Sequence, residues 1–218
     1  MKTVRNLIPI LFLSLLLISC SSGNKVELFN GENLDNWNVF VSEPDVDPEK
    51  VFWVEDGLIH TTGVPHAYID TKETYGNFKL HVEWRWTEEP TNSGVLLHKQ
   101  GEDMIWPLCI ECQLQNGNAG DIVLIGKGSG ITIQGTPHLI TSEENRYAVI
   151  KKFEESSEHA AGEWNTYDIT SQDGNIEVIV NGVLQNTGTD MTLTSGKIAL
   201  QSEGSPMQFR NIHLEVIE

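Results

Sequence analysis

The residues best suited to acid/base chemistry lie in the segment 107–115, which reads PLCIECQLQ. Side chains alternate between the two faces of a strand, so Glu111 and Gln113 would share one face with Cys109 and Gln115. The opposite face is apolar, with Leu108, Ile110, Cys112 and Leu114. Because the apolar face belongs against a core, we expect Glu111 to face a groove, where a carboxyl group can exchange a proton with a ligand.

Polar side chains of other predicted strands have the alternation needed to join this surface. We predict substrate-binding roles for a set of five, namely Glu83, Arg85, Gln113, Gln201 and Glu203. The alternative is that these side chains form the solvated outer face of a sheet. The pair Glu111 and Gln113 argues against the alternative, because two polar residues at this spacing are unusual in a strand that is otherwise apolar.

Two further residues are candidates for proton transfer beside Glu111. His98 follows the apolar run NSGVLL toward the predicted groove, whereas the other six histidines fall on outer faces, near turns or at strand ends. Asp121, in the turn GNAGD, could supply a second carboxylate or serve only the turn. We therefore predict Glu111, His98 and Asp121 as the catalytic residues.

No pair of histidines has the close spacing of a zinc motif. We therefore predict no cofactor and no tightly held metal. If a divalent ion does bind, Glu83, His98, Glu111 and Asp121 are the residues that could converge on it. Cys109 and Cys112 have the C-x-x-C spacing of redox and zinc motifs, but positions three apart on a strand point to opposite faces. We expect two separate buried thiols.

Period-two alternation dominates the rest of the chain and predicts strands. In the segment 79–86, Leu80, Val82, Trp84 and Trp86 share one face. Further predicted strands cover 51–60, 67–71, 93–99, 121–125, 130–134, 163–169, 196–202 and 206–217. The segment 174–187 predicts a hairpin, because Asn181-Gly182 is the preferred pair for a type I′ turn.

Two details complete the predicted architecture. The alternation of the segment 206–217 slips by one residue around Arg210-Asn211, which predicts a β-bulge. Many strands, few helical patterns and regular Gly, Asn and Asp turns predict an all-β fold, a sandwich or barrel of two packed sheets. We expect Leu80, Val82, Trp84, Ile110, Leu114, Ile198 and Leu200 in its core.

The N-terminal segment has the pattern of a secretory signal. Lys2 and Arg5 precede an apolar run from Leu7 to Ile18, which is too short to span a bilayer of about 30 Å. The run ends in LISC, which resembles a bacterial lipobox with Cys20 as the lipidated residue. We predict a signal peptide over 1–19, a lipidated tether over 20–25 and attachment to a membrane of the cell envelope, periplasmic or outer-membrane. The alternative is a secreted protein in which Cys20 stays free.

The charge of the chain bears on its partners. Loss of Lys2 and Arg5 with the signal peptide would leave 12 basic and 31 acidic residues, a net charge of −19. Nucleic acid is therefore excluded as an expected partner. No repeat, low-complexity block or linker divides the remainder, so we predict a single domain over 26–218.

Four groups of motifs together resemble the 3-keto-disaccharide hydrolase domain, in a lipoprotein of the Bacteroidetes type. They are LFNGENLDNW at 28–37 with FWVEDGLI at 52–59, the strand that carries Glu83 and Trp84 with the NSG turn at 92–94, WPLCIECQLQNGNAGD at 106–121, and GEWN at 162–165 with VNG at 180–182 and KIALQSEGSPMQFRNI at 197–212. Each motif is weak alone, but their shared order along the chain is specific. The resemblance implies a concanavalin A-like lectin/glucanase jelly roll.

The resemblance also implies cleavage of glycosides whose glucose ring carries a ketone at C3. Such a ketone acidifies the C2 proton, so that a base can remove it and the enolate can expel the substituent at C1, with or without later addition of water. The protein must supply a base, a group that stabilises the enolate oxygen, and an acid for the leaving group.

One departure separates the chain from glucanases of this fold. Laminarinase-type glucanases carry E-x-D-x-x-E on a comparable strand, and a retaining mechanism needs two carboxylates about 5–5.5 Å apart. Here the corresponding residues are Glu111, Gln113 and Asn116, so one carboxylate remains. Members of the 3-keto family often have an aspartate where Asn116 stands, and Asp121 could replace it.

A carbohydrate-binding lipoprotein of the same fold without catalytic activity is the alternative function. Such a protein would use aromatic side chains such as Trp84, Trp86 and Trp106 together with glutamines. Alternation places Trp84 and Trp86 in the core, which weakens this alternative and favours an enzyme.

Overall fold

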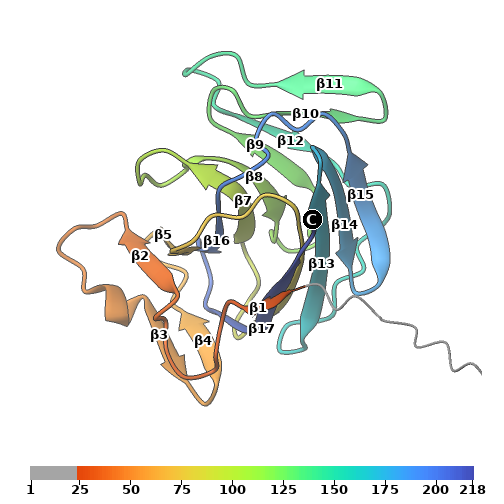
Figure 1. The fold of residues 1–218 in the computed structure, drawn as a ribbon. Helices are drawn as coiled ribbons and strands as arrows, with labels where there is room; N and C mark the ends of the chain where they lie inside the picture. The colour runs from red at the N-terminus through yellow and green to blue at the C-terminus, as the bar shows by residue number, and fades with distance from the viewer. Residues whose placement is uncertain (1–23) are drawn as a thin grey trace, which may run out of the picture.

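The predicted strands form two antiparallel sheets that pack face to face (Figure 1). The structure is a computed structural model that describes residues 24–218. The predicted signal peptide and Cys20 lie outside the described residues. Among residues 24–218, no helix is long and apolar enough to cross a membrane.

Sheet A has the strand order β15-β14-β13-β6-β17-β4-β3, with β1 paired to β17. Its strands are β1 (Lys25–Glu27), β3 (Phe52–Glu55), β4 (Leu58–Thr61), β6 (Phe78–Trp86), β13 (Asn165–Gln172), β14 (Asn175–Val180), β15 (Val183–Gly188) and β17 (Met207–Val216).

Sheet B has the order β12-β9-β8-β7-β16-β5-β2. Its strands are β2 (Trp37–Val41), β5 (Ala67–Thr71), β7 (Gly94–Gln100), β8 (Leu108–Gln113), β9 (Ile122–Ile125), β12 (Tyr147–Ile150) and β16 (Lys197–Ser202). A separate hairpin of β10 (Gly130–Ile133) and β11 (Thr136–Leu139) lies at the top of Figure 1, and a short 3-10 helix spans Pro48–Lys50.

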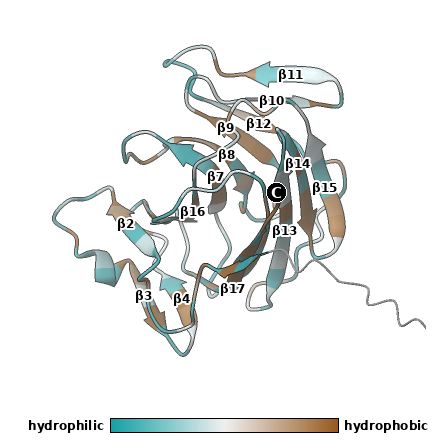
Figure 2. Ribbon diagram, viewed as in Figure 1, coloured by the Kyte–Doolittle hydropathy of each residue, from teal (hydrophilic) through white to brown (hydrophobic). Residues whose placement is uncertain are grey.

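The core lies between the two sheets and confirms the predicted faces. All seven predicted core residues are at most 1% exposed and belong to one apolar cluster. Trp84 and Trp86 are both in this cluster, so neither can serve as a binding platform. Figure 2 shows the contrast between β9 of the sandwich, which is hydrophobic, and the more hydrophilic β11 outside it.

The two local predictions of backbone geometry are confirmed. Asn181 and Gly182 both have positive φ, 49° and 78°, and connect Val180 to its partner Val183 in a tight hairpin. The pairing of β17 with β6 shifts between Arg210 and His213, where Asn211 has a φ of 48°. The bulge accommodates the slip in alternation that the sequence shows.

Other strand predictions differ from the structure. The segment 51–60 is a hairpin of β3 and β4 that turns at Asp56-Gly57, rather than one strand. The short strands β1, β2, β11 and β12 were not predicted.

The outer face of sheet B carries a second, smaller apolar cluster, formed by Tyr68, Leu96, Cys109, Val123, Ile125 and Ala199. Its residues are buried although they lie outside the core. The loop 101–107 lies against this face, because Asp103 accepts hydrogen bonds from the Tyr68 hydroxyl at 2.8 Å and from Lys99 Nζ at 2.5 Å. Cys109 on this face and Cys112 in the core are separate free thiols, as predicted.

Candidate active site

A groove of about 300 Å³ opens on the outer face of sheet B, beside the smaller apolar cluster. It runs between Trp106 of the loop 101–107 and Tyr147 of the edge strand β12. Its lining consists of Asn92, Trp106, Glu111, Gln113, Val123, Ile125, Arg146, Tyr147, Val149 and Glu203. Three of the predicted site residues, Glu111, Gln113 and Glu203, are thus brought together here.

Strand register places Glu111 at the middle of this surface. On β8 it pairs with Leu96 of β7 on one side and with Val123 of β9 on the other. Gln113, two residues on, pairs with Gly94 of β7. The alternation that puts Ile110 and Cys112 in the core therefore directs Glu111 and Gln113 into the groove, as the sequence predicts.

Gly94, the glycine of the NSG turn, provides the space that Glu111 needs. A Cβ atom at Gly94 would lie 2.3 Å from Glu111 Oε1 and 2.4 Å from Gln201 Oε1, far inside van der Waals contact. The side chains of Glu111 and Gln201 therefore meet over a residue that has no side chain. Gln201 comes from β16, the neighbour of β7, so three strands build this point of the groove.

The environment of Glu111 favours its neutral form. The residue is only 4% exposed, and its Oε1 atom has no hydrogen-bond partner among residues 24–218. Burial, and then the negative charge of Glu203, raise the pKa of the Glu111 carboxyl well above its usual range. A carboxyl group held neutral in this way can donate a proton to a bound ligand.

Gln201 and Gln113 are held in different ways. The Gln201 side chain is buried, and its Oε1 atom also lacks a partner among residues 24–218. Gln113 Oε1 accepts hydrogen bonds from the backbone N–H groups of Leu114 and Gln115, both at 2.9 Å. These bonds fix the amide orientation and leave Nε2 of Gln113 as the end that can donate to a ligand.

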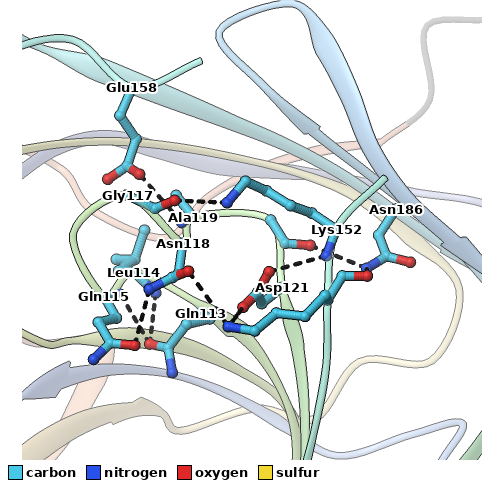
Figure 3. Close-up of polar contacts among 12 residues, drawn as sticks. Gln113, Leu114, Gln115, Gly117, Asn118, Ala119, Asp121, Lys152, Glu158 and Asn186 are labelled. Carbon is cyan, nitrogen blue, oxygen red and sulfur yellow. Dashed lines mark hydrogen bonds and ion pairs between the residues drawn. The ribbon is translucent and has the colours of Figure 1, made fainter. Parts of the chain in front are cut away.

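Asp121 is not part of the groove lining, which corrects its predicted catalytic role. Figure 3 shows its carboxylate within the contacts of the β8–β9 loop. Asp121 Oδ1 accepts a hydrogen bond from the backbone N–H of Lys152 at 2.9 Å, and Oδ2 forms an ion pair with Lys151 Nζ at 2.8 Å. Both oxygens thus join the loop to the chain after β12, and Asp121 stabilises the structure beside the site.

His98 lies on the opposite side of sheet B from the groove, so its prediction as a groove residue is wrong. Its ring packs 5.5 Å from the ring of Phe78, and its Nε2 is 2.8 Å from the hydroxyl of Ser171, both residues of sheet A. The reason is local: His98 has a φ of 53°, and the pairing of β7 with β8 shifts between Leu97 and Gln100. This irregularity reverses the alternation. Burial lowers the pKa of His98 to about 4.

Glu83 and Arg85 lie on the outer face of sheet A, so their predicted place beside Glu111 is also wrong. Glu83 accepts hydrogen bonds from Arg210 at 2.6 Å and Asn211 at 2.8 Å, at the bulge of β17. Arg85 contacts Gln208 and the ring of Trp164. Alternation correctly directs both side chains away from the core, but it does not say to which sheet β6 belongs.

A partly buried ion network supports the loop that forms one wall of the groove. Lys99 of β7 contacts Asp70 of β5 at 2.6 Å as well as Asp103 of the loop, and Lys197 contacts Asp70 at 2.9 Å. Burial alone would lower the pKa of Lys99, but its hydrogen bonds to Asp103 and Asp70 outweigh burial and raise that pKa. The charges satisfy one another, so the network anchors the loop 101–107.

Several lining residues were not predicted from the sequence. Asn92 was recognised only as part of the NSG motif, where its backbone bridges to that of Glu203. Tyr147 and Val149 come from β12, whose alternation could have revealed them. Arg146 precedes β12 and donates to the carbonyl of Trp106 at 3.4 Å, so it links the two walls of the groove.

The described part of the chain holds no cluster of three or more His, Cys, Asp or Glu side chains that could ligate a metal ion. The four residues named above as a possible set are dispersed. Glu83 lies on sheet A, His98 lies between the sheets, and Asp121 is paired with Lys151, so only Glu111 faces the groove.

Nearly the whole described chain matches one protein family. The profile of the 3-keto-alpha-glucoside-1,2-lyase-like domain matches residues 24–215, nearly the whole described chain. The chain belongs to this family. Membership supports a carbohydrate-active protein.

Solved structures share the fold at low sequence identity. A protein from Parabacteroides distasonis ATCC 8503 classed as a glycosyl hydrolase is 24% identical, with a TM-score of 0.63 over 90% of this chain and 94% of that one. A β-glucanase from Bacillus licheniformis is 14% identical, with a TM-score of 0.55 over 91% of this chain and 100% of that one.

The carbohydrate-binding module CBM66 from Bacillus subtilis is 8% identical, with a TM-score of 0.54 over 83% of this chain and 95% of that one. No curated protein matches the chain significantly. The similarities establish the two-sheet, concanavalin A-like jelly roll expected from the sequence.

Proposed function

We propose that this protein is an enzyme that cleaves 3-keto-glycosides, such as 3-keto-glucosides or 3-keto-disaccharides, in the groove of sheet B. The observation that carries the proposal is Glu111: a buried carboxyl group with a raised pKa and an unpartnered oxygen, at the centre of a groove in a member of this family. Such a group costs stability, which is typical of sites selected for proton transfer.

The proposed reaction begins with removal of the proton at C2 of the sugar, which the ketone at C3 makes acidic. The resulting enolate expels the oxygen substituent at C1, and this oxygen takes up a proton as it leaves. The product has a double bond between C1 and C2, and addition of water across that bond gives 3-keto-glucose. Without the water step the enzyme is a lyase, and with it the overall reaction is hydrolysis.

Two carboxyl groups of the groove can share this proton traffic. Glu111, whose neutral form is favoured, is placed to donate the proton to the leaving oxygen. Glu203, half-buried in the same lining, is the group available to accept the proton from C2. The amide groups of Asn92 and Gln113 can donate hydrogen bonds to sugar and enolate oxygens. We propose no cofactor, because the ketone of the substrate supplies the activation.

A carbohydrate-binding protein without catalytic activity is the second candidate function. It is favoured by two exposed aromatic side chains at the rim of the groove, Trp106 at 53% and Tyr147 at 72% exposure. Aromatic rims are common in sugar-binding proteins, since the faces of sugar rings pack on aromatic rings. A binding protein has little use for an unpaired buried carboxyl group such as that of Glu111, so we favour the enzyme.

The cellular setting remains part of the proposal. We propose that Cys20 carries the lipid and that the domain acts at a membrane of the cell envelope, on a carbohydrate substrate and without nucleic acid. The strongly acidic chain, with a formal net charge of −17, supports the last point.

The test is release of the aglycone from purified protein incubated with a 3-keto-glucoside and, separately, with the parent glucoside. We expect turnover of the keto sugar and essentially none of the parent compound. Comparable cleavage of both would indicate an ordinary glycosidase that uses Glu111 and Glu203, and saturable binding without turnover of either would indicate the binding protein.

A further inference from the structure

The groove has two chemically different halves, and their boundary lies at Glu111. Five of the ten lining residues are aromatic or aliphatic: Trp106, Val123, Ile125, Tyr147 and Val149. Four of these come from the adjacent strands β9 and β12, whose register pairs Val123 with Val149 and Ile125 with Tyr147. The outer part of the groove, toward the edge of sheet B, is therefore a continuous apolar surface.

The polar half begins at β8 and extends toward the middle of the sheet. It contains Gln113, Asn92 and Glu203 in the lining, with Gln201 buried beside Glu111. The partners of Glu111 follow the same division, since Gln201 approaches it over Gly94 and Val123 pairs with it on the outer side. A proton donor at this boundary is suited to cleaving a glycosidic bond that joins a polar sugar to an apolar aglycone.

The apolar half is accessible to a ligand. Val149 is 46% exposed although it is aliphatic, and Tyr147 beside it is the most exposed of the large hydrophobic side chains in the described chain. Trp106, the fifth apolar lining residue, lies in the loop 101–107, and its ring is 6.2 Å from that of His66, the residue before β5. The apolar half is therefore an aliphatic surface that carries one exposed aromatic ring, that of Tyr147.

We propose that the polar half binds the keto sugar and that the apolar half binds a flat, apolar aglycone, such as a benzyl or other aromatic alcohol, in preference to a second sugar. This inference rests on the proposed function and names the substrate class for it. Val123, Ile125 and Val149 offer no hydrogen bonds to hydroxyl groups, so a second sugar would leave several hydroxyls unpaired when it loses water. An aromatic aglycone has no hydroxyl groups to leave unpaired and gains contact with the aliphatic side chains and with the ring of Tyr147.

The experiment compares leaving groups of similar acidity, so that chemical reactivity does not decide the outcome. Three 3-keto-glucosides of primary alcohols serve: the benzyl glucoside, the methyl glucoside and the disaccharide in which the leaving group is O6 of glucose. We expect kcat/KM for the benzyl compound to exceed that of both others by about tenfold or more, the usual effect of filling an apolar subsite. A disaccharide that equals or exceeds the benzyl compound would overturn the proposal.

Two variants locate the preference. Val149→Thr keeps the shape but adds a hydroxyl, and Tyr147→Ala removes one ring. Each should lower kcat/KM for the benzyl compound by about tenfold and for the methyl compound by less than about threefold. Val183→Thr is the matched control, because Val183 is an exposed valine on β15 of sheet A, and it should leave the ratio of benzyl to methyl turnover at the wild-type value. Equal losses on both substrates would contradict the proposed subsite.

Failure of the proposed function is distinguishable from failure of this inference. If the wild type cleaves none of the three compounds, calorimetric titration with the same compounds decides the subsite. Tighter binding of the benzyl compound, lost in Val149→Thr and kept in Val183→Thr, would support the apolar subsite in a binding protein. Equal affinities for the benzyl and methyl compounds would overturn it.

Discussion

At the scale of residues, the groove depends on a carboxyl group placed where it is poorly solvated. Glu111 could be recognised from the sequence because it interrupts an apolar strand, and alternation gave its direction. Its raised pKa could not be predicted, because it depends on neighbours from other parts of the chain. Gly94 of β7 and Gln201 of β16 meet its side chain, and Glu203, the residue after β16, adds its charge.

Glu111→Gln should remove proton transfer and keep the size of the side chain. We expect kcat on a 3-keto-glucoside to fall by about 10²–10⁴, the usual contribution of a positioned general acid or base. Substrate binding and the unfolding midpoint should change little, because the amide avoids the cost of a buried carboxyl group. The measurement is steady-state kinetics, with thermal unfolding as the check on folding.

Glu83→Gln is the matched control for that experiment. Glu83 lies on the outer face of sheet A and binds Arg210 and Asn211, so its loss should leave kcat/KM at the wild-type level. Wild-type kinetics of Glu111→Gln, or an equal loss of kcat/KM in both variants, would show that Glu111 is not the general acid.

Gly94→Ala tests the space over which Glu111 and Gln201 meet. The added methyl group would lie 2.3 Å from Glu111 Oε1 and 2.4 Å from Gln201 Oε1, so both side chains must move. We expect a fall in kcat/KM of at least about tenfold, since misplacement of a catalytic group by about 1 Å can cost about 10² in rate. Gly76→Ala is the control, because the nearest atom would be 3.6 Å away and activity should stay unchanged. Normal activity of Gly94→Ala would mean that this approach is not needed for catalysis.

At the scale of elements, alternation predicts the wrong side of the sheet for one residue of β7, His98. Regular alternation would direct His98 to the same side as Gly94 and Leu96. The left-handed backbone at His98 instead turns its ring toward Ser171 and Phe78. A single residue with this φ is not visible in the pattern of apolar residues, because only the pairing with β8 and β16 reveals the shift.

The buried His98 should make the stability of the fold depend on pH. Its pKa is about 4 in the folded protein and about 6.5 in an unfolded chain. The unfolded chain therefore binds more protons between these values, so the folded state loses stability as pH falls from about 6.5 to 4, by up to about 3 kcal/mol. We expect the stability of His98→Gln to lack this pH-dependent contribution.

The measurement is urea unfolding of the wild type and of His98→Gln at several pH values in this range. The free energy of unfolding of the wild type, minus that of the variant, should decrease by up to about 3 kcal/mol from pH 6.5 to pH 4. A constant difference would show that His98 titrates alike in both states. Contributions of the carboxyl groups cancel in the subtraction.

The positions of the strands in the sequence were more predictable than the sheet to which each strand belongs. The strand ranges, the Asn181-Gly182 hairpin and the bulge at Arg210-Asn211 follow from local patterns of residues. Which sheet contains β6, and hence where Glu83 and Arg85 lie, depends on pairing with β13 and β17, which are far away in the sequence. Local patterns carry no information about such partners.

At the scale of the whole molecule, the sandwich separates its stabilising residues from its site. The core between the sheets holds the large apolar side chains, while one outer face of sheet B holds the groove. Family membership could be predicted because motifs from the N-terminal, central and C-terminal parts of the chain occur in the same order, and residues 24–215 match the family.

The proposed lipid anchor is tested on the full chain. If Cys20 is cut and acylated, the wild type should sediment with membranes and carry the added mass of the acyl chains. Cys20→Ala should be released into the soluble fraction or remain uncleaved. Cys109→Ala is the control, because this thiol is buried in the smaller apolar cluster of sheet B and should not affect fractionation. Identical soluble fractionation of wild type and Cys20→Ala, without added mass, would refute the anchor.

The central claim is that a C3 ketone allows the groove to remove the proton at C2. The most direct measurement is kcat/KM for a 3-keto-glucoside that carries deuterium at C2, relative to the same compound with hydrogen. We predict slower turnover of the deuterated compound. Where water adds across the C1–C2 double bond, the product formed in deuterated water should also carry label at C2. Equal rates for both compounds together with no label at C2, while the parent glucoside is cleaved as fast as the keto sugar, would contradict the account.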